Sequence, residues 1–177
     1  MFGSRDIDSY LTAREAAAVS AWRVSGKQWH VMRDGPFHRS TVLAGLWGGA
    51  NYENMTEAAR VKQLLTGVQP NTYKFYDQRI LHGRVWPVIR DRAAIYDSYN
   101  CGMVWKFGHC RAWPTRRYAP AAVCCRGLLT AQLVCGCREG FYYVGYGPTK
   151  NYAVRALRRK RCPVACRPEA HRDWQYC

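Results

Sequence analysis

Hydrophobic and polar positions along the first hundred residues predict helices that alternate with short strands. An alanine-rich stretch over 13–24 predicts a helix, because Thr12 is a suitable N-cap and Gly26 stands just beyond the last turn. Apolar residues spaced for one helix face, or alternating with polar ones, predict the other elements. These are helices over 54–65 and 77–86 and strands over 28–32 and 93–96. This order of elements is typical of an α/β domain.

Three local signals refine this pattern. Glycines interrupt the apolar segment 42–49, which disfavours a helix there and indicates a packed turn or a close approach of the backbone to a ligand. Pro87 is expected to end the helix over 77–86. Asn54 and Glu57 form a variant of the capping box, and this accounts for Asn54 more simply than its place in an N-glycosylation motif.

Length and charge narrow the class of protein. The chain has 177 residues, the length of one ordinary domain, and a formal net charge of +15. Such a charge attracts nucleotide sugars, nucleic acid, sulfated glycans or anionic membranes. Arginine predominates over lysine, which favours planar, bidentate recognition of phosphate or carboxylate groups. The arginine-rich run over 155–161 fits this interpretation, and a solvated basic face explains it equally well.

All nine cysteines follow residue 100, and they favour disulfides in an oxidising compartment. Zinc is the competing interpretation, but Cys135-x-Cys137 and Cys162-x3-Cys166 lack the repeated Cys-x2-Cys spacing of zinc knuckles. The pairing of the cysteines stays open at this point. The sequence shows neither a membrane-spanning apolar stretch nor a signal peptide. Because a lumenal protein needs such a signal, we expect that the chain lacks its true N-terminus.

The segment Arg5-Asp6-Ile7-Asp8-Ser9 carries the clearest candidate chemistry. Two carboxylates that are separated by one residue at the end of a strand project to the same side. Their oxygen atoms suit a hard divalent cation, Mg²⁺ or Mn²⁺, and leave positions open for a diphosphate. Such a cation would neutralise a leaving nucleoside diphosphate. The pair is common by itself, and an exposed turn also accounts for it.

The motifs around this pair resemble, in order and spacing, those of glycosyltransferase-like proteins of the GT-A type. In that family an Arg-Asp-x-Asp-Ser motif opens a helix with Arg-Glu, and a short strand leads to Met-Arg-Asp. A Gly-x-Trp-Gly loop and an Asp-Gln helix complete the site. The chain carries these motifs at 5–9, 14–15, 32–34, 45–48 and 77–78. The resemblance covers about residues 4–117 and resumes at 140–177, where Cys162-Pro-x2-Cys166-Arg-Pro and His171-x-Asp173-Trp174 look like a matching tail.

The resemblance implies an α/β fold, a partial GT-A (nucleotide-diphospho-sugar transferase-like) domain with an irregular, cysteine-rich C-terminal part. Residues 1–117 would be the C-terminal portion of the GT-A-like domain, from the Asp-x-Asp motif onward. Residues 118–139 match no pattern and are expected to be an insertion. Residues 140–177 would supply a closing strand, at 141–144, and a basic, cysteine-containing tail. The strands that precede the metal motif in the family are missing, so we expect exposed sheet edges.

The resemblance also implies roles for individual residues. Asp6 and Asp8 would hold Mn²⁺ or Mg²⁺ and, through it, the donor. Asp77 would lie near the anomeric carbon or the acceptor hydroxyl as the catalytic base, or would contact the donor sugar, with an N-cap of the helix over 77–86 as the competing role. The expected substrate-binding residues are Arg5, Arg33, Asp34, His38, Trp47 and Gln78. Apart from the family role, solvation in a loop would account for His38, and burial in a turn for Trp47.

The expected function is therefore metal-dependent transfer of a sugar from a nucleotide-sugar donor to a glycan or protein acceptor, with the chain incomplete and inactive by itself. The resemblance and the cysteines imply the Golgi lumen or the secretory pathway. No specific nucleic acid is expected as a partner, and this chain has no recognisable transmembrane segment. Two alternatives stay open. One is a basic, cysteine-containing module that binds polyanions such as nucleic acid or sulfated glycan, and the other is a non-functional product of a mispredicted gene.

Overall fold

A five-stranded mixed sheet organises the structure. The computed structural model describes residues 1–7, 9, 11–50, 55–115 and 161–174. The strands are β1 (Phe2–Arg5), β2 (Trp29–Arg33), β3 (Leu46–Gly49), β4 (Ala93–Asp97) and β5 (Cys110–Arg111), and their order across the sheet is β1-β3-β2-β4-β5. β3 pairs antiparallel with both β1 and β2, whereas the β2–β4 and β4–β5 pairs are parallel. The prediction of an α/β fold is confirmed at this level, and its assignment to the GT-A type stays an expectation.

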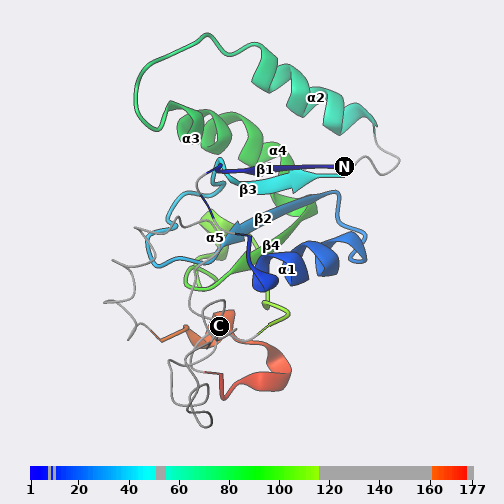
Figure 1. Cartoon of the computed structure of the whole chain (residues 1–177), viewed down its shortest axis with the longest axis vertical. Helices are drawn as coiled ribbons and strands as arrows, with labels where there is room; N and C mark the ends of the chain where they lie inside the picture. The colour runs from blue at the N-terminus through cyan, green and yellow to red at the C-terminus, as the bar shows by residue number, and fades with distance from the viewer. Residues whose placement is uncertain (8, 10, 51–54, 116–160, 175–177) are drawn as a thin grey trace, which may run out of the picture.

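Helices cover both faces of this sheet (Figure 1). The α-helices are α1 (Ala13–Arg23), α2 (Met55–Thr66), α3 (Tyr76–Ile80), α4 (Trp86–Ile89) and α5 (Val104–Phe107). A π-helical turn, η1 (Leu81–Val85), joins α3 to α4, and short 3₁₀ turns are formed by η2 (Arg90–Arg92), η4 (Val164–Cys166) and η5 (Glu169–His171). α1 lies on one face of the sheet, and α2, η1 and α4 lie on the other, so the chain builds three layers.

Alternation along the two central parallel strands divides the core between these faces. Successive side chains of a strand point to opposite sides of the sheet. Val31 and Ile95 accordingly pack with α2, η1 and α4, whereas their neighbours Met32 and Tyr96 pack with α1. All five residues of β2 and all five of β4 are buried. Burial on both faces is typical of parallel strands, and here it extends to the polar residues His30, Arg33 and Asp97.

The predicted helix over 13–24 is confirmed, and so is its N-cap. The Thr12 hydroxyl accepts a hydrogen bond from the backbone N–H of Glu15 at 3.1 Å, and the helix runs from Ala13 to Arg23. Gly26 has a φ of +67°, the left-handed conformation that glycine adopts at low cost after a helix. Local sequence signals were sufficient to predict this helix, because an N-cap interacts with residues only a few positions away in the sequence.

Two local expectations were wrong. Pro87 does not end its helix, because it lies inside α4 and the chain remains helical through Ile89. A proline removes one backbone donor and crowds the carbonyl group four residues earlier. Here the residue four positions before Pro87 lies in η1, the wider π-helical turn that directly precedes α4. The glycine-rich segment 42–49 is also not simply a turn, because its second half forms strand β3, which lies between β1 and β2.

The glycines of β3 are explained by close approach to the neighbouring strands. A Cβ at Gly48 would lie 2.4 Å from the carbonyl oxygen of Phe2 and 2.5 Å from Nε2 of His30. A Cβ at Gly49 would lie 2.5 Å from the ring of Trp29. The close contact expected for this segment therefore exists, and among the described residues it is made with other strands of the same sheet.

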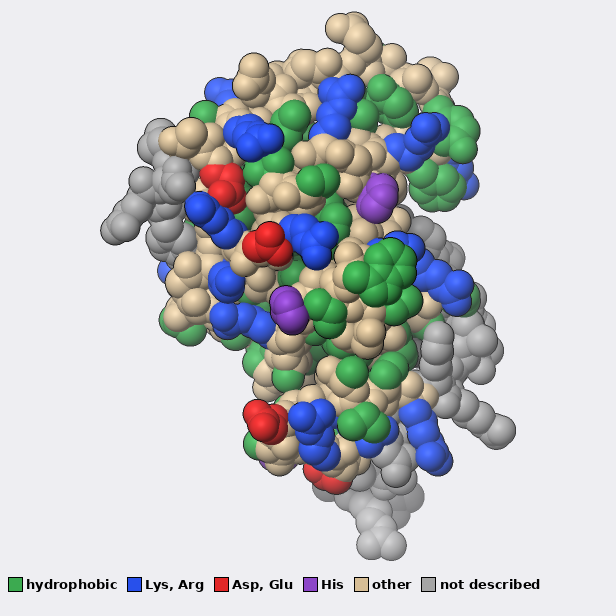
Figure 2. Space-filling model, turned by 180° about the vertical axis from the view of Figure 1, so that it is seen from behind, with side chains coloured by type: hydrophobic (Ala, Val, Ile, Leu, Met, Phe, Trp, Pro, Cys, Tyr) green, Lys and Arg blue, Asp and Glu red, His purple; other side chains and the backbone are tan. Residues whose placement is uncertain are grey.

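Basic side chains cover much of the surface. Figure 2 shows lysine and arginine spread over the face seen from behind, interspersed with apolar and neutral side chains. The exposed basic residues include Arg23, Arg39, Arg60, Lys62, Lys74, Arg79, Arg84, Arg92, Arg111, Arg161 and Arg172. They come from α1, α2, α3, η1, η2, β5 and several loops, so the positive charge of the described part is distributed over the surface.

Several sequence-based expectations concern residues that the structure does not describe. These are the capping role of Asn54, the insertion over 118–139, the strand over 141–144 and most of the basic run over 155–161. Within the described part of the chain, no helix has both the length and the apolar character needed to cross a membrane.

A glycine-to-alanine pair tests the packing of the sheet. Gly48→Ala should lower the free energy of unfolding by about 1–3 kcal/mol, because its Cβ has no room between β1 and β2. A Cβ at Gly3, the partner of Gly48 in the β1–β3 register, would meet no atom within 4 Å, so Gly3→Ala is the matched control and should be close to neutral. Urea unfolding of both variants measures the difference. Equal stability of the two would contradict the packing described here.

A buried histidine makes stability depend on pH. His30 is 3% exposed, and its ring lies 4.2 Å from that of Trp22 between centroids. Its Nδ1 has no hydrogen-bond partner among the described atoms, and burial lowers its pKa from 6.5 to about 4. The folded state therefore holds His30 neutral where the unfolded chain already binds a proton.

The sign of this effect follows from the two pKa values. The contribution of His30 is fully present above pH 6.5 and declines as the pH falls towards 4, by about 3 kcal/mol in total. His30→Phe should flatten the loss of stability between pH 7 and pH 5 compared with the wild type, whereas His109→Gln, at an exposed position, should keep the wild-type slope. Urea titrations at several pH values measure these slopes. Parallel slopes for the wild type and His30→Phe would refute the assignment.

Candidate functional site

A cavity of about 590 Å³ lies where β1 and β3 meet the end of α2 and the beginning of α3. Its polar and aromatic lining residues are Ser4, Trp47, Gln69, Asn71, Tyr73, Tyr76 and Asp77. Apolar residues complete the lining; they are Ala44, Leu65, Val68, Pro70, Ile80 and Leu81. A volume of this size and a largely apolar wall with a few polar groups are typical of small-molecule sites.

The segment before β3 forms one wall of the cavity, and Gln78 holds it. In the amide orientation that satisfies both groups, Gln78 donates to the carbonyl oxygen of Val42 and accepts from the N–H of Ala44, each at 2.9 Å. Ser4 Oγ donates a further bond to the carbonyl oxygen of Ala44 from the β1 side. Hydrogen bonds from Gln78 and from Ser4 therefore hold the segment around Val42 and Ala44 from both sides. Trp47 follows this segment, which helps to position its ring in the cavity wall.

Asp6 lies against the same segment. It directly follows β1, as expected for the first carboxylate of the Asp-x-Asp motif. A Cβ at Gly45 would lie 2.4 Å from Cγ of Asp6, so the glycine leaves room for this carboxylate. Asp8 lies outside the described residues, so the geometry of the pair is not established. The structure thus brings Asp6, Trp47, Asp77 and Gln78 together around one segment.

Asp77 is presented by a strained helix start. Phe75, the residue before α3, has a φ of +69°, a left-handed conformation that is uncommon for an aromatic residue. α3 begins at Tyr76, so Asp77 is not its N-cap, and the competing role proposed for this residue was wrong. The Asp77 carboxylate is exposed, and Oδ1 accepts a hydrogen bond from the N–H of Gln78 at 2.8 Å. The carboxylate is therefore available to a ligand in the cavity.

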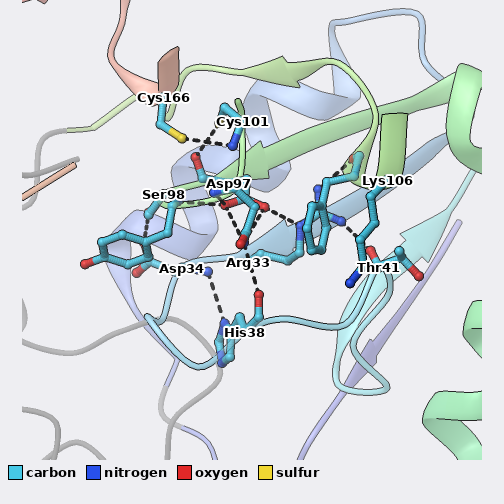
Figure 3. A network of polar contacts seen from close by, with 12 residues as sticks. Arg33, Asp34, His38, Thr41, Asp97, Ser98, Cys101, Lys106 and Cys166 are labelled. Carbon is cyan, nitrogen blue, oxygen red and sulfur yellow. Dashed lines mark hydrogen bonds and ion pairs between the residues drawn. The ribbon is translucent and has the colours of Figure 1, made fainter. Parts of the chain in front are cut away.

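Arg33 lies in a different place, inside the protein. Its side chain is fully buried and forms an ion pair with Asp97, which is also fully buried. The remaining guanidinium nitrogens donate to the carbonyl oxygens of Thr41 and, at 2.9 Å, of Phe107 (Figure 3). These bonds occupy the donors that a substrate phosphate would use, and the residue does not line the cavity.

Asp34 and His38 belong to the same buried network. Asp34 Oδ1 accepts hydrogen bonds from Ser98 Oγ at 2.6 Å and from Arg14 Nε at 3.1 Å. His38 Nδ1 accepts from the N–H groups of Asp34 and Gly35, at 3.1 and 3.0 Å. His38 is buried, so its interpretation as a solvated loop residue was wrong. Substrate contacts by these two residues stay a prediction, because neither lines the cavity.

Arg5 and Trp47 are also held by the protein itself. Arg5 pairs with Glu15 of α1 and donates to the carbonyl oxygen of Ser9 at 3.1 Å, so it ties the chain around the Asp-x-Asp motif to the helix that follows. Trp47 is 4% exposed and stacks on Trp29, with 6.1 Å between ring centroids. Burial was the alternative proposed for Trp47, and the ring is buried in strand β3 while it also lines the cavity.

Sequence reasoning missed Asp97 and the residues around it. Oδ1 of Asp97 accepts from the N–H groups of Tyr99 and Asn100, both at 2.8 Å, in addition to its ion pair with Arg33. The available signal was a run of polar residues directly after the strand predicted at 93–96. The carboxyl ends of neighbouring parallel strands lie together. The polar residues that follow β4 therefore lie beside the polar residues that follow β2.

No protein-family model matches this chain, and the comparisons with curated proteins and with solved structures find no match either. The case for a function therefore depends on the residues and their geometry. An exposed carboxylate, aromatic side chains and an apolar wall can contact the hydroxyl groups and the apolar face of a sugar ring. Asp6 does not line the cavity, but its carboxylate lies against Gly45, which directly follows the lining residue Ala44.

The buried ion pair gives a prediction about stability. Asp97→Asn removes the charge that balances Arg33 and should cost about 3–5 kcal/mol in the free energy of unfolding, because a buried guanidinium would lose its counter-ion. Asp173→Asn removes a carboxylate at an exposed position and should change stability by less than about 0.5 kcal/mol. Chemical unfolding of both variants at neutral pH measures the costs. An Asp97 variant as stable as the control would show that the pair is not essential to the fold.

Proposed function

We propose that this chain carries part of the sugar-transfer site of a glycosyltransferase-like protein that uses a nucleotide-sugar donor and a divalent cation. The observation that carries the proposal is the arrangement around the segment before β3. Asp6 packs on Gly45, Gln78 binds Val42 and Ala44, and Asp77 lines the adjoining cavity. Residues from three distant parts of the sequence meet there, and all belong to motifs that resemble the family.

The residues that are present fit a hard cation on the β1 side of the site. Asp6 is exposed at the end of a strand, and the absence of a side chain at Gly45 gives its carboxylate space. Carboxylate oxygens are the ligands that Mn²⁺ and Mg²⁺ prefer. Asp6, with Asp8 from the same motif, would hold the ion. When bound, the ion would neutralise the diphosphate of the donor.

The sugar would lie in the cavity itself. Asp77 offers an exposed carboxylate that can accept a hydrogen bond from a sugar hydroxyl or a proton from an acceptor hydroxyl. Tyr73 and Tyr76 provide aromatic rings and hydroxyl groups on the same side of the cavity. Gln78 acts indirectly, because its amide is used to position the wall. Arg33, Asp34 and His38 support the site by holding the loop between β2 and β3.

Binding of polyanions is the second candidate function, and the net charge of +15 is the observation that favours it. The exposed basic residues are distributed over the described surface, as Figure 2 shows for one face. A general field of this kind supports non-specific binding that weakens strongly with salt. It does not account for the arrangement of Asp6, Asp77 and Gln78.

Metal-dependent binding of nucleoside diphosphates tests the proposal. Calorimetric titration of the full chain with uridine or guanosine diphosphate should show binding that needs Mn²⁺. Asp6→Asn should weaken it roughly tenfold or more, because a metal ligand is lost. Asp91→Asn is the matched control and should bind like the wild type, since Asp91 is an exposed carboxylate outside the Asp-x-Asp motif that pairs with Arg90.

Two other outcomes would count against the transferase. Binding that is indifferent to Mn²⁺ and to Asp6 but disappears at high salt would indicate the polyanion-binding module. Absence of any diphosphate binding by a folded chain, shown by a normal unfolding transition, would remove the support for a donor site.

A further inference from the structure

Four cysteines gather on the face of the sheet that α1 covers. Cys101 follows β4, Cys110 lies in β5, and Cys162 and Cys166 belong to the C-terminal segment over 161–174. All four pack in or against one core cluster with Trp22, Tyr96 and Trp113 as its large members. The sequence did not predict which of these cysteines form disulfides with each other, and none of them belongs to the site proposed above.

Cys101 and Cys166 are in direct contact although 65 positions separate them in the sequence. The N–H of Cys101 donates to Sγ of Cys166 at 3.2 Å, and Figure 3 shows the Cys166 side chain directed at Cys101. Hydrogen bonds with the Cys110 thiol and with the Cys166 thiol, together with burial, raise the pKa of Cys101. The two sulfur atoms lie within 4.8 Å of each other.

A metal ion is the obvious competitor, because a carboxylate oxygen of Asp97 lies within the same 4.8 Å group. However, this carboxylate already pairs with Arg33 and accepts bonds from Tyr99 and Asn100. The guanidinium of Arg33 also places a positive charge directly beside the position that a cation would take. Two sulfurs and an oxygen that is already committed make a poor zinc site, which normally has four ligands.

We propose that Cys101 and Cys166 form a disulfide that fastens the C-terminal segment to the loop after β4. The 3₁₀ turns η4 and η5 of this segment take no part in the sheet. The side-chain hydrogen bonds of Arg167 and Arg172 stay within the segment, on the carbonyl groups of Cys162, Arg172 and Val164. The segment is attached to the core by the burial of Cys162 and Cys166, and Cys162 is itself disulfide-bonded. A Cys101–Cys166 bond would be a further covalent link, made directly to the loop after β4.

The chemistry is thiol–disulfide exchange with a disulfide oxidant such as glutathione disulfide. One protein thiolate attacks the oxidant and forms a mixed disulfide, which releases one glutathione thiol. The second protein thiolate then attacks the protein sulfur of the mixed disulfide, which forms the Cys101–Cys166 bond and releases the second thiol. Two protons and two electrons pass from the protein to the oxidant. The Cys110 thiol also contacts Cys101, so it is the competing partner that the experiment must distinguish from Cys166.

Peptide mapping of the full chain tests this inference. The protein is equilibrated with glutathione disulfide, quenched in acid, alkylated, digested without reductant and analysed by mass spectrometry, with its zinc content measured in parallel. We expect one linked peptide that joins Cys101 to Cys166 and is lost after reduction. Its mass should be about 2 Da below the sum of the two reduced peptides, since two hydrogens are removed.

Variants sharpen the assignment. Cys166→Ser should remove this link and allow Cys101 to pair with Cys110, whereas Cys162→Ser, in the same buried segment, should keep the link. The wild-type map needs no variant, so a variant that fails to fold does not affect the result. Complete alkylation of Cys101 and Cys166 after equilibration would overturn the proposal, as would a different partner for Cys101 in the wild type. Protection of both thiols by stoichiometric zinc would also overturn it. None of these outcomes depends on diphosphate binding.

Discussion

The ion pair between Arg33 and Asp97 is the interaction on which the rest of the structure depends. It joins the carboxyl ends of the parallel strands β2 and β4, and both side chains are fully buried. Arg33 also binds backbone carbonyls of Thr41 and Phe107, and Asp97 caps the turn after β4 through Tyr99 and Asn100. A buried charge is tolerated only with such complete pairing, so this one contact determines how the loops at this end of the sheet are placed.

Two functional features follow from those loops. The loop that Arg33 and His38 hold after β2 leads into the segment between Val42 and Gly45, which Gln78 fastens beside the cavity. The turn that Asp97 caps places Cys101 against Cys166. The proposed donor site and the proposed disulfide thus lie on different elements that the same network supports.

Local signals predicted a large part of the fold. The Thr12 cap and alanine-rich composition gave α1, and apolar periodicity gave α2, β2 and β4 close to their observed bounds. The strand β3 was missed because glycines disfavour a strand locally, whereas pairing on both edges with β1 and β2 compensates for that preference. The helix through Pro87 was missed for a similar reason. Packing of Trp86 and Ile89 in the core outweighs the lost backbone hydrogen bond.

The sequence by itself identified candidate residues for chemistry, since carboxylates, aromatic rings and an amide are recognisable by residue type alone. It did not divide them into those at a surface and those inside. Only the tertiary structure made that division, because Arg33 can be buried only where a partner from 64 positions later neutralises it. The same long-range packing brings Asp6, Trp47, Asp77 and Gln78 around one segment. Charge neutralisation and sheet pairing act between distant positions, and no local pattern contains them.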